Sequence, residues 1–99
     1  MSETTTLVVT AAPNPQEMAS VQEYLKGVMP LLTSAGGNLV KRLKVDDVIN
    51  GQPSGMVLVM DFDSADAIKS MFESDEYAAL VPVRDRGFAE MNILLTQGM

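Results

Sequence analysis

The stretch Met56-Val57-Leu58-Val59-Met60-Asp61-Phe62 decides the fold, because it is apolar at almost every position over the length of a strand. Apolar residues on both faces are typical of a strand that is covered from both sides of its sheet. The segment 4–12, which contains Leu7-Val8-Val9, is rich in β-branched residues and has the same character. The sequence therefore predicts two strands, over residues 4–12 and 56–62, that each have a second apolar face to bury.

A long helix is predicted after the first strand, over residues 15–35. Pro13-Asn14-Pro15 ends the strand, Asn14 is a suitable N-cap, and proline suits the first helical position. Gly36-Gly37 ends the helix, because glycine adopts the left-handed conformation at little cost. Steps of three and four residues predict one apolar stripe that faces the core, made of Met18, Val21, Leu25, Val28, Leu32 and Ala35.

A further strand is predicted over residues 38–45, followed by a turn-rich connection. Its alternation places two basic side chains, Arg42 and Lys44, on the face opposite to the apolar ones. The apolar face is expected to carry Leu39, Leu43 and Val45.

The last third of the chain predicts two helices and a final strand. Asp63 or Ser64 caps the first of these helices, and Ser74 caps a short extra helix that Pro82 ends. The strand covers residues 88–96. The complete order is therefore β-α-β-β-α-β.

This order is the split βαβ arrangement, so we expect one α+β domain over residues 1–99, with ferredoxin-like topology and a four-stranded antiparallel sheet. Right-handed crossovers place the strands at 4–12 and 56–62 in the centre of the sheet. Helices can cover only one of its faces. The sheet of a second copy would cover the other, so the sequence predicts a homodimer, a dimeric α/β barrel.

The composition excludes several classes of function. The formal net charge is −6 and histidine is absent, so the chain would repel phosphate backbones and we expect no nucleic-acid partner. Cysteine is also absent, which excludes disulfides, thiolate nucleophiles and sulfur-ligated metals. With neither residue to hold a transition metal, we expect no metal and no cofactor.

No membrane partner is expected either. The N-terminus lacks the basic and apolar regions of a signal peptide. The longest purely apolar run, Met56 to Met60, is far below the ~20 residues that a membrane span needs. The cytoplasm is the predicted compartment.

The second half of the chain resembles a known family. The pattern consists of Met60-Asp61-Phe62-Asp63-Ser64, then Ala67, then residues 74–80 (Ser-Asp-Glu-Tyr-Ala-Ala-Leu), which lead to Arg84. It resembles the uncharacterised family called domain of unknown function 1330, a small member of the dimeric α/β-barrel group. Met71-Phe72 stand where that family often has Trp-Tyr, so two hydrogen-bonding groups are lost here. The resemblance implies the fold and the dimer, and it implies no particular reaction.

Ser74, Tyr77 and Arg84 are the first candidates for a ligand site, because they could line a polar pocket between sheet and helices. The structural alternative is that Ser74 caps a helix, Tyr77 packs with its hydroxyl bonded, and Arg84 pairs with a nearby acid. Because Pro82 is expected to end the short helix, Arg84 is predicted to lie beyond it. Ser74 is not expected to be a nucleophile, since no histidine exists to activate it.

Three more residues are candidate ligand contacts. Tyr24 is predicted to face away from the apolar stripe and Arg42 to lie on the polar face of its strand. Related barrels bind their ligands between helices and sheet, so the resemblance implies that either residue could contact one. Asp61, close to Asp63 and Asp66, could help to bind a divalent cation. If buried, Asp61 could act as a general base through a raised pKa. The alternative is that these acids complement the dipole of the following helix.

Two functions remain open. One is a dimeric module that binds a small ligand, either apolar or carrying a carboxylate, with Arg84 as the anion partner and methionines as an adaptable lining. The other is a cofactor-free isomerase or monooxygenase acting on a small organic substrate, as some dimeric α/β barrels are. The imidazole and indole groups typical of such enzymes are absent from this sequence.

Overall fold

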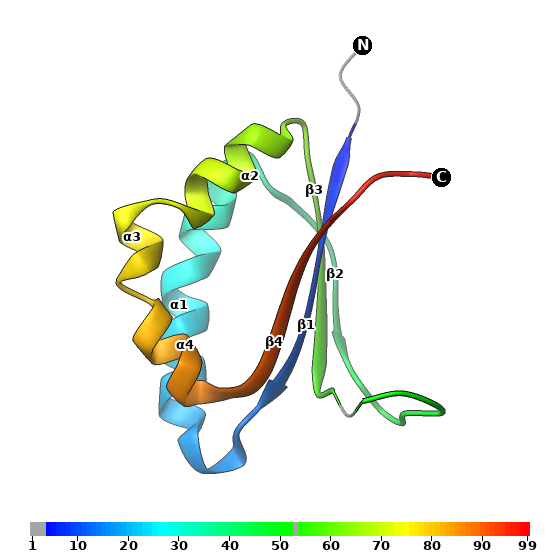
Figure 1. Cartoon of the computed structure of the whole chain (residues 1–99), viewed down its shortest axis with the longest axis vertical. Helices are drawn as coiled ribbons and strands as arrows, with labels where there is room; N and C mark the ends of the chain where they lie inside the picture. The colour runs from blue at the N-terminus through cyan, green and yellow to red at the C-terminus, as the bar shows by residue number, and fades with distance from the viewer. Residues whose placement is uncertain (1–3, 53) are drawn as a thin grey trace.

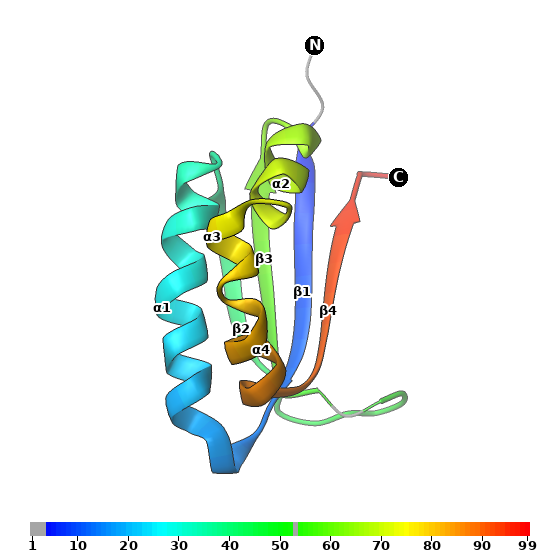
Figure 2. The same ribbon diagram turned by 60° about the vertical axis from the view of Figure 1, so that its left-hand side comes forward.

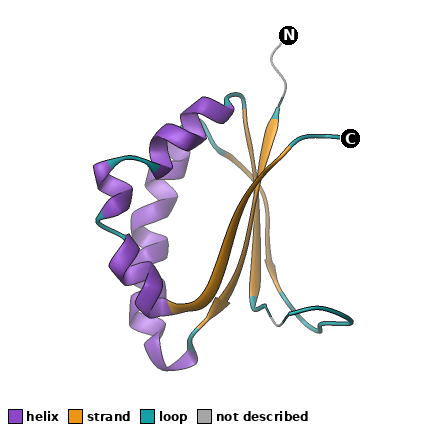
Figure 3. Cartoon of the chain, in the orientation of Figure 1, coloured by secondary structure: helices purple, strands orange, loops and turns teal. Residues whose placement is uncertain are grey.

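The computed structural model describes residues 4–52 and 54–99, and its helices lie together on one side of a single sheet (Figures 1 and 3). The elements in chain order are β1 (Thr5–Pro13), a 3-10 turn (Pro15–Glu17), α1 (Met18–Ser34), β2 (Asn38–Lys44), β3 (Met56–Phe62), α2 (Ala65–Phe72), α3 (Asp75–Ala78), α4 (Val81–Gly87) and β4 (Phe88–Thr96).

The four strands are ordered β2-β3-β1-β4, and each neighbouring pair is antiparallel. This is the α+β, ferredoxin-like β-α-β-β-α-β fold, with the two strands that are apolar on both faces in the centre, as the sequence predicts. Figure 2 shows α1 and the row formed by α2, α3 and α4 lying side by side over the same face of the sheet.

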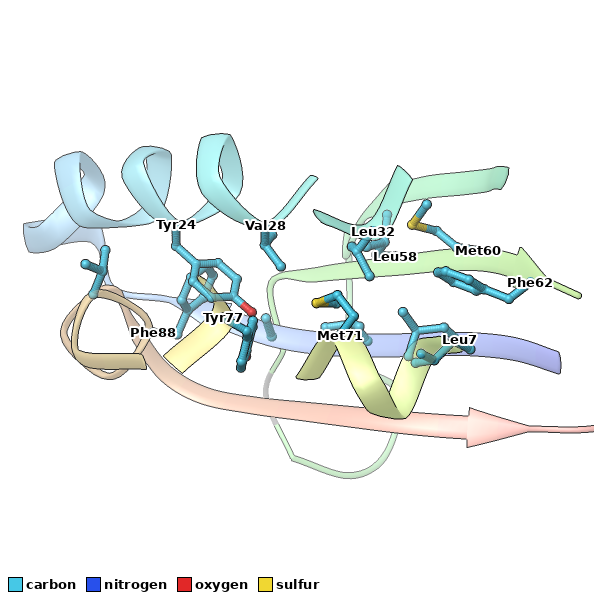
Figure 4. Close-up of a cluster of buried hydrophobic side chains, with 14 of the residues drawn as sticks. Leu7, Tyr24, Val28, Leu32, Leu58, Met60, Phe62, Met71, Tyr77 and Phe88 are labelled. Carbon is cyan, nitrogen blue, oxygen red and sulfur yellow. The ribbon is translucent and has the colours of Figure 1, made fainter. Parts of the chain in front are cut away.

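The core lies between this helical layer and the sheet (Figure 4). From the sheet it takes alternate residues, such as Leu7 on β1 and Met60 and Phe62 on β3, all at most 1 % exposed. From the helices it takes residues such as Leu32 and Ile68, which are 2 % and 1 % exposed. Burying side chains of this size removes their apolar surface from water, which is the main favourable term in folding.

The opposite face of the sheet, which we call the open face, has no helix over it in the described part of the chain (Figure 1). Val8 of β1 stands directly between Val59 of β3 and Leu94 of β4 on this face. Leu94 is 49 % exposed, and Val8 and Val59 are each partly exposed. Three adjacent strands thus present apolar side chains where a sheet facing only water would carry polar ones.

The predicted alternation of β2 is wrong at one point. The pairing of β2 with β3 shifts its register between Leu39 and Lys41, which is a β-bulge or a similar irregularity. Leu39 therefore pairs with the buried Met60 and lies on the helical face, whereas Leu43 pairs with Val57 on the open face. One extra residue exchanges the faces of all the residues that follow it.

The buried face of α1 is also rotated from its prediction. The helix buries Ser20, Val21, Tyr24, Val28 and Leu32. Leu25 is only partly buried, and Met18 is 46 % exposed. The reason is that α1 lies over the sheet (Figure 2) and also contacts α4 beside it, so the buried arc turns toward that neighbour.

Pro82 begins a helix rather than ending one. It stands in the first turn of α4, where a proline needs no hydrogen-bond partner for its nitrogen and its fixed φ suits the helix. Arg84 is consequently part of α4, and the prediction that it follows the end of a helix is wrong. The cap predictions are confirmed, because the Ser64 hydroxyl accepts from the Ala67 amide at 3.1 Å and the Asn14 side chain accepts from the Gln16 amide at 3.0 Å.

None of the helices in residues 4–52 and 54–99 has the length and the apolar character that crossing a bilayer requires.

The rotation of α1 makes a prediction about stability. Leu32→Ala should lower the free energy of unfolding by about 2–5 kcal/mol, because it leaves a cavity at a fully packed position. Leu25→Ala should cost clearly less, since that side chain is only partly buried. Urea unfolding of the two variants beside the wild type measures both losses. Equal losses would contradict the observed orientation of α1.

Candidate functional site

A chain of hydrogen bonds joins two buried tyrosines to one arginine at the junction of α1, α3 and α4. The Tyr24 and Tyr77 hydroxyls are 2.9 Å apart, and the side chains are 4 % and 3 % exposed. An Nη of Arg84 donates to the Tyr77 hydroxyl at 3.1 Å. The prediction that Tyr24 faces away from the buried side of its helix is therefore wrong. Tyr24, Tyr77 and Arg84, all three predicted as candidate site residues, do meet in the structure.

Ser74 positions Tyr77 through the backbone. Its hydroxyl accepts a hydrogen bond from the Tyr77 amide at 3.2 Å and donates one to the Met71 carbonyl at 2.6 Å. The first bond caps α3, and the second holds α3 against the end of α2. Ser74 is thus the helix cap of the structural alternative, and both of these contacts are to backbone atoms.

Aromatic edges hold the two tyrosine rings in place (Figure 4). Tyr24 meets Phe88 edge to face, with ring centroids 5.5 Å apart, and Tyr77 meets Phe72 in the same way at 4.8 Å. This geometry is the preferred one for aromatic pairs. Phe72 occupies one of the two positions at which the sequence departs from the family pattern, and there it packs without adding a polar group.

The surroundings fix the protonation states of this cluster. Burial, followed by the hydrogen bond to Tyr77, raises the pKa of the Tyr24 phenol far above its usual value, so Tyr24 stays neutral. For Arg84, partial burial alone would lower the pKa, but the hydrogen bonds from its guanidinium to Tyr77 and Asp85 outweigh burial and raise it. The cluster therefore contains one permanent positive charge and a tyrosine that stays neutral.

Arg84 also forms an ion pair, the one found among the described residues. Its guanidinium lies 3.2 Å from a carboxylate oxygen of Asp85, the next residue in the chain. Asp85 is 65 % exposed in this pair, so water screens the interaction and it contributes about 0–1 kcal/mol at most. The nearby acid of the structural alternative is thus Asp85, on the same helix.

Arg84 lies between two clefts that follow the helical side of β4. The first has a volume of about 360 Å³ and is lined by Ile68, Lys69, Phe72, Glu73, Tyr77, Arg84, Ile93 and Leu95. The second has a volume of about 500 Å³ and is lined by Arg84, Asp85, Phe88, Ala89, Glu90, Met91 and Ile93. The Arg84 side chain is 27 % exposed, so its guanidinium is held in place and still reaches the solvent of both clefts.

This arrangement can bind an anion more readily than it can transfer a proton. A guanidinium forms paired hydrogen bonds with a carboxylate, and the apolar walls of the first cleft lower the local dielectric around such a pair. Tyr77, which lines the same cleft, could add a hydrogen bond through its hydroxyl. Proton abstraction would need a base. The guanidinium and the neutral Tyr24 cannot act as one, and the carboxylate in the lining of the first cleft, that of Glu73, is exposed to solvent.

Arg42, predicted as a possible ligand contact, lies elsewhere. It is on the helical face of β2, in a separate cleft of about 490 Å³ that it shares with Lys44, Met18 and Leu25 among others. This cleft opens on the β2 side of α1, whereas Arg84 lies on the β4 side. The structure therefore does not bring Arg42 to the tyrosine cluster.

Asp61 is on the open face and outside both clefts of Arg84. It is partly buried, and its carboxylate accepts a hydrogen bond from the Thr6 hydroxyl at 2.7 Å, across the β1–β3 pair. Within residues 4–52 and 54–99, no group of three acids is close enough to hold a cation. Asp61, Asp63 and Asp66 therefore do not form the cation site that their spacing left open.

Some of the walls of the first cleft were not predicted as site residues. The rest of its lining consists of Ile68, Lys69, Phe72 and Glu73 and of the β4 residues Ile93 and Leu95. The alternation of β4 predicts that Ile93 and Leu95 share a face, but only the tertiary structure shows that the helices leave this edge of the face accessible.

The raised pKa of Tyr24 makes a prediction about alkaline pH. In the unfolded chain this phenol loses its proton above about pH 10, whereas in the folded protein it keeps it. The folded state then binds the extra proton, so stability falls as the pH rises above 10. Urea unfolding between pH 8 and 11 should show a shallower loss for Tyr24→Phe, by up to about 1.4 kcal/mol per pH unit. Identical slopes in both proteins would contradict the buried, neutral Tyr24.

Comparison with known proteins agrees with this fold. The chain is similar to a solved protein of unknown function, RPA0582 from Rhodopseudomonas palustris, with a TM-score of 0.81 and 14% identity over 100% of this chain and 85% of that one. It is also similar to a putative antibiotic biosynthesis monooxygenase from Nitrosomonas europaea, with a TM-score of 0.71 and 14% identity over 100% and 93% of the two chains.

A third similar structure is a dimeric protein of unknown function and ferredoxin-like fold from Bacteroides fragilis, with a TM-score of 0.63 and 12% identity over 96% of each chain. These identities show a shared fold and nothing further. No curated protein matches the sequence. The family model described as a domain of unknown function, DUF1330, matches residues 5–99. The chain belongs to the DUF1330 family.

Proposed function

We propose that this protein is a homodimer joined through its open faces, and that each copy binds a small carboxylate-bearing ligand with an apolar body in the cleft between α2 and β4. The observation that carries the proposal is the place of Arg84. Its guanidinium is fixed by Tyr77 and remains 27 % exposed at the end of a largely apolar cleft.

The open face supports the homodimer. Its apolar centre, Val8 between Val59 and Leu94, spans three strands and has no helix over it. A domain of about this size leaves a considerable share of its apolar surface exposed, and pairing two such faces removes it from water. The structural neighbour from Bacteroides fragilis is described as dimeric, which is consistent with this use of the fold.

The cleft between α2 and β4 supports the choice of ligand. Ile68, Phe72, Ile93 and Leu95 offer an apolar surface, and its volume of about 360 Å³ lies in the range of small-molecule sites. Arg84 supplies a fixed positive charge and Lys69 a second one, in a protein whose net charge is −6. An aliphatic or aromatic monocarboxylate matches both features, whereas a ligand with several carboxylates or phosphates would also meet the carboxylate of Glu73.

Catalysis is the second candidate. The similar structure from Nitrosomonas europaea is named a putative antibiotic biosynthesis monooxygenase, and Tyr77 lines the cleft, where its hydroxyl could donate to a substrate carbonyl. A cofactor-free isomerase or monooxygenase would use that hydroxyl to stabilise an enolate. The absence of histidine and tryptophan leaves binding as the better supported of the two functions.

The dimer predicts a particular effect of charge on the open face. Sedimentation equilibrium at micromolar concentration should give the mass of two chains for the wild type. Val59→Lys should give one chain, because the dimer would bury an unpaired charge. Ser70→Lys, which adds the same charge to the exposed surface of α2, should remain dimeric. A wild-type protein that sediments as a monomer would contradict the shared-barrel arrangement.

The ligand cleft predicts a selective loss of affinity. We would measure binding of short-chain and aromatic monocarboxylates by calorimetry, each beside its uncharged carboxamide. Arg84→Met should weaken carboxylate binding by about tenfold to a hundredfold, corresponding to about 1.5–3 kcal/mol for a charged hydrogen bond in a desolvated site. Arg86→Met, on the same helix and outside the cleft, is the matched control and should bind as the wild type does. A carboxylate that binds both variants equally would remove Arg84 from the site.

A further inference from the structure

Residues 46–51, which we call the arm, project from the end of the sheet on the side of the open face (Figures 1 and 3). The arm lies beyond the backbone hydrogen bond from the Val45 amide to the Gly55 carbonyl, at 2.9 Å. The Asp47 side chain accepts from the Val48 amide at 2.9 Å, and Gly51 has a φ of +112°, which favours glycine. Ile49 in the arm is 98 % exposed.

An isoleucine in that position contributes nothing to the core of its own copy. What it contacts in a dimer depends on where the second copy lies. Packed sheets lie about 10 Å apart, and the arm extends on the side where the second sheet would lie. A two-fold axis then places each arm beside an edge of the other sheet. This step rests on the homodimer of the proposed function.

Charge indicates which edge the arm meets. β2, an outer strand of the sheet, carries Lys41, Arg42 and Lys44 within four residues. An axis perpendicular to the strands would run β2 along β2 of the partner and place these bases against their own copies, which is unfavourable. An axis parallel to the strands runs β2 along β4 of the partner, the edge that carries Glu90.

The register agrees with the parallel axis. Lys44 pairs with Met56, Met56 with Ala11, and Ala11 with Met91, so these residues lie at one height across the sheet. Rotation about an axis parallel to the strands keeps that height. Lys44 of one copy and Glu90 of the other then lie at the same end of the seam between the two edges.

At that end of the sheet β4 begins, beside the second cleft of Arg84 (Figure 1). Phe88, Met91 and Ile93 give this cleft an apolar floor, and its charged residues are Arg84, Asp85 and Glu90. The arm carries Val48-Ile49, which match the apolar floor. The apolar residues of the arm, rather than its aspartates, would therefore make the contact.

We propose that the two copies exchange their arms, and that each Ile49 lies against the first residues of the other copy's β4. The arm then closes the second cleft and leaves the first, between α2 and β4, open for the ligand. Arg84 becomes the wall between the two.

Disulfide trapping tests this exchange directly, because the wild-type chain contains no cysteine. The full-length double variant Ile49→Cys/Ala89→Cys is oxidised in solution with copper phenanthroline and run on a non-reducing gel. We expect a covalent dimer in severalfold higher yield than in either single variant, since a disulfide requires the two Cα atoms to lie within about 7 Å. All of the substituted positions are exposed, so the variants should fold.

The double variant Ile49→Cys/Asn38→Cys is the matched control, because Asn38 begins β2 at the other end of the opposite edge. Equal or greater trapping of the 49–38 pair would overturn the arm exchange and indicate the perpendicular axis. Sedimentation of the reduced variants separates the two proposals. A dimer without the 49–89 link overturns the exchange alone, whereas a monomer overturns the homodimer and the exchange together.

Discussion

The helices of this protein cover one face of a four-stranded sheet, and most other features depend on that constraint. β1 and β3 are central in the sheet and apolar on both faces, so the helical layer satisfies only half of their side chains. Leu7 and Met60 are buried under the helices, while Val8 and Val59, their sequence neighbours, lie partly exposed on the open face. The same alternation that builds the core thus creates the surface that we propose as the dimer interface.

The polar cluster at the helical junction has a different origin. Tyr24, Tyr77 and Arg84 come from three helices, and each bond in the chain satisfies a group whose isolation under the helices would be costly. No buried side-chain polar atom in the described residues is left without a partner. The cluster therefore fixes how α3 and α4 lie against α1, and it holds a guanidinium at the edge of the sheet as a consequence. Arg84 can belong to this network and also contact the proposed ligand, because its side chain remains 27 % exposed.

The fold alone leaves the activity open, since a ferredoxin-like domain supports many functions and the function must be argued from the site. In this chain the site combines apolar walls with one cation that is held by a hydrogen bond, and the other charged residues of its lining are Lys69 and Glu73. The other basic cleft, at Arg42 and Lys44, opens on the far side of α1. Arg84 and Arg42 therefore line different clefts, which the sequence alone could not show. Of the two, Arg84 has its guanidinium fixed by a hydrogen bond to Tyr77.

The sequence by itself determined the order of the strands, the helices α1, α2 and α3, the two central strands and the caps at Asn14, Ser64 and Ser74, because these depend on local periodicity and on single polar residues next to helix starts. Tertiary structure decided what local pattern cannot contain. One shift of register in β2 put Leu39 and Leu43 on opposite faces, and contact with α4 turned Tyr24 inward. Pro82, which was predicted to end a helix, stands in the first turn of α4, because a proline's missing amide hydrogen costs nothing there. Of the predicted site residues, Tyr24, Tyr77 and Arg84 meet directly with Ser74 behind them, while Arg42 and Asp61 lie apart, because packing rather than spacing chooses which helices and strands adjoin.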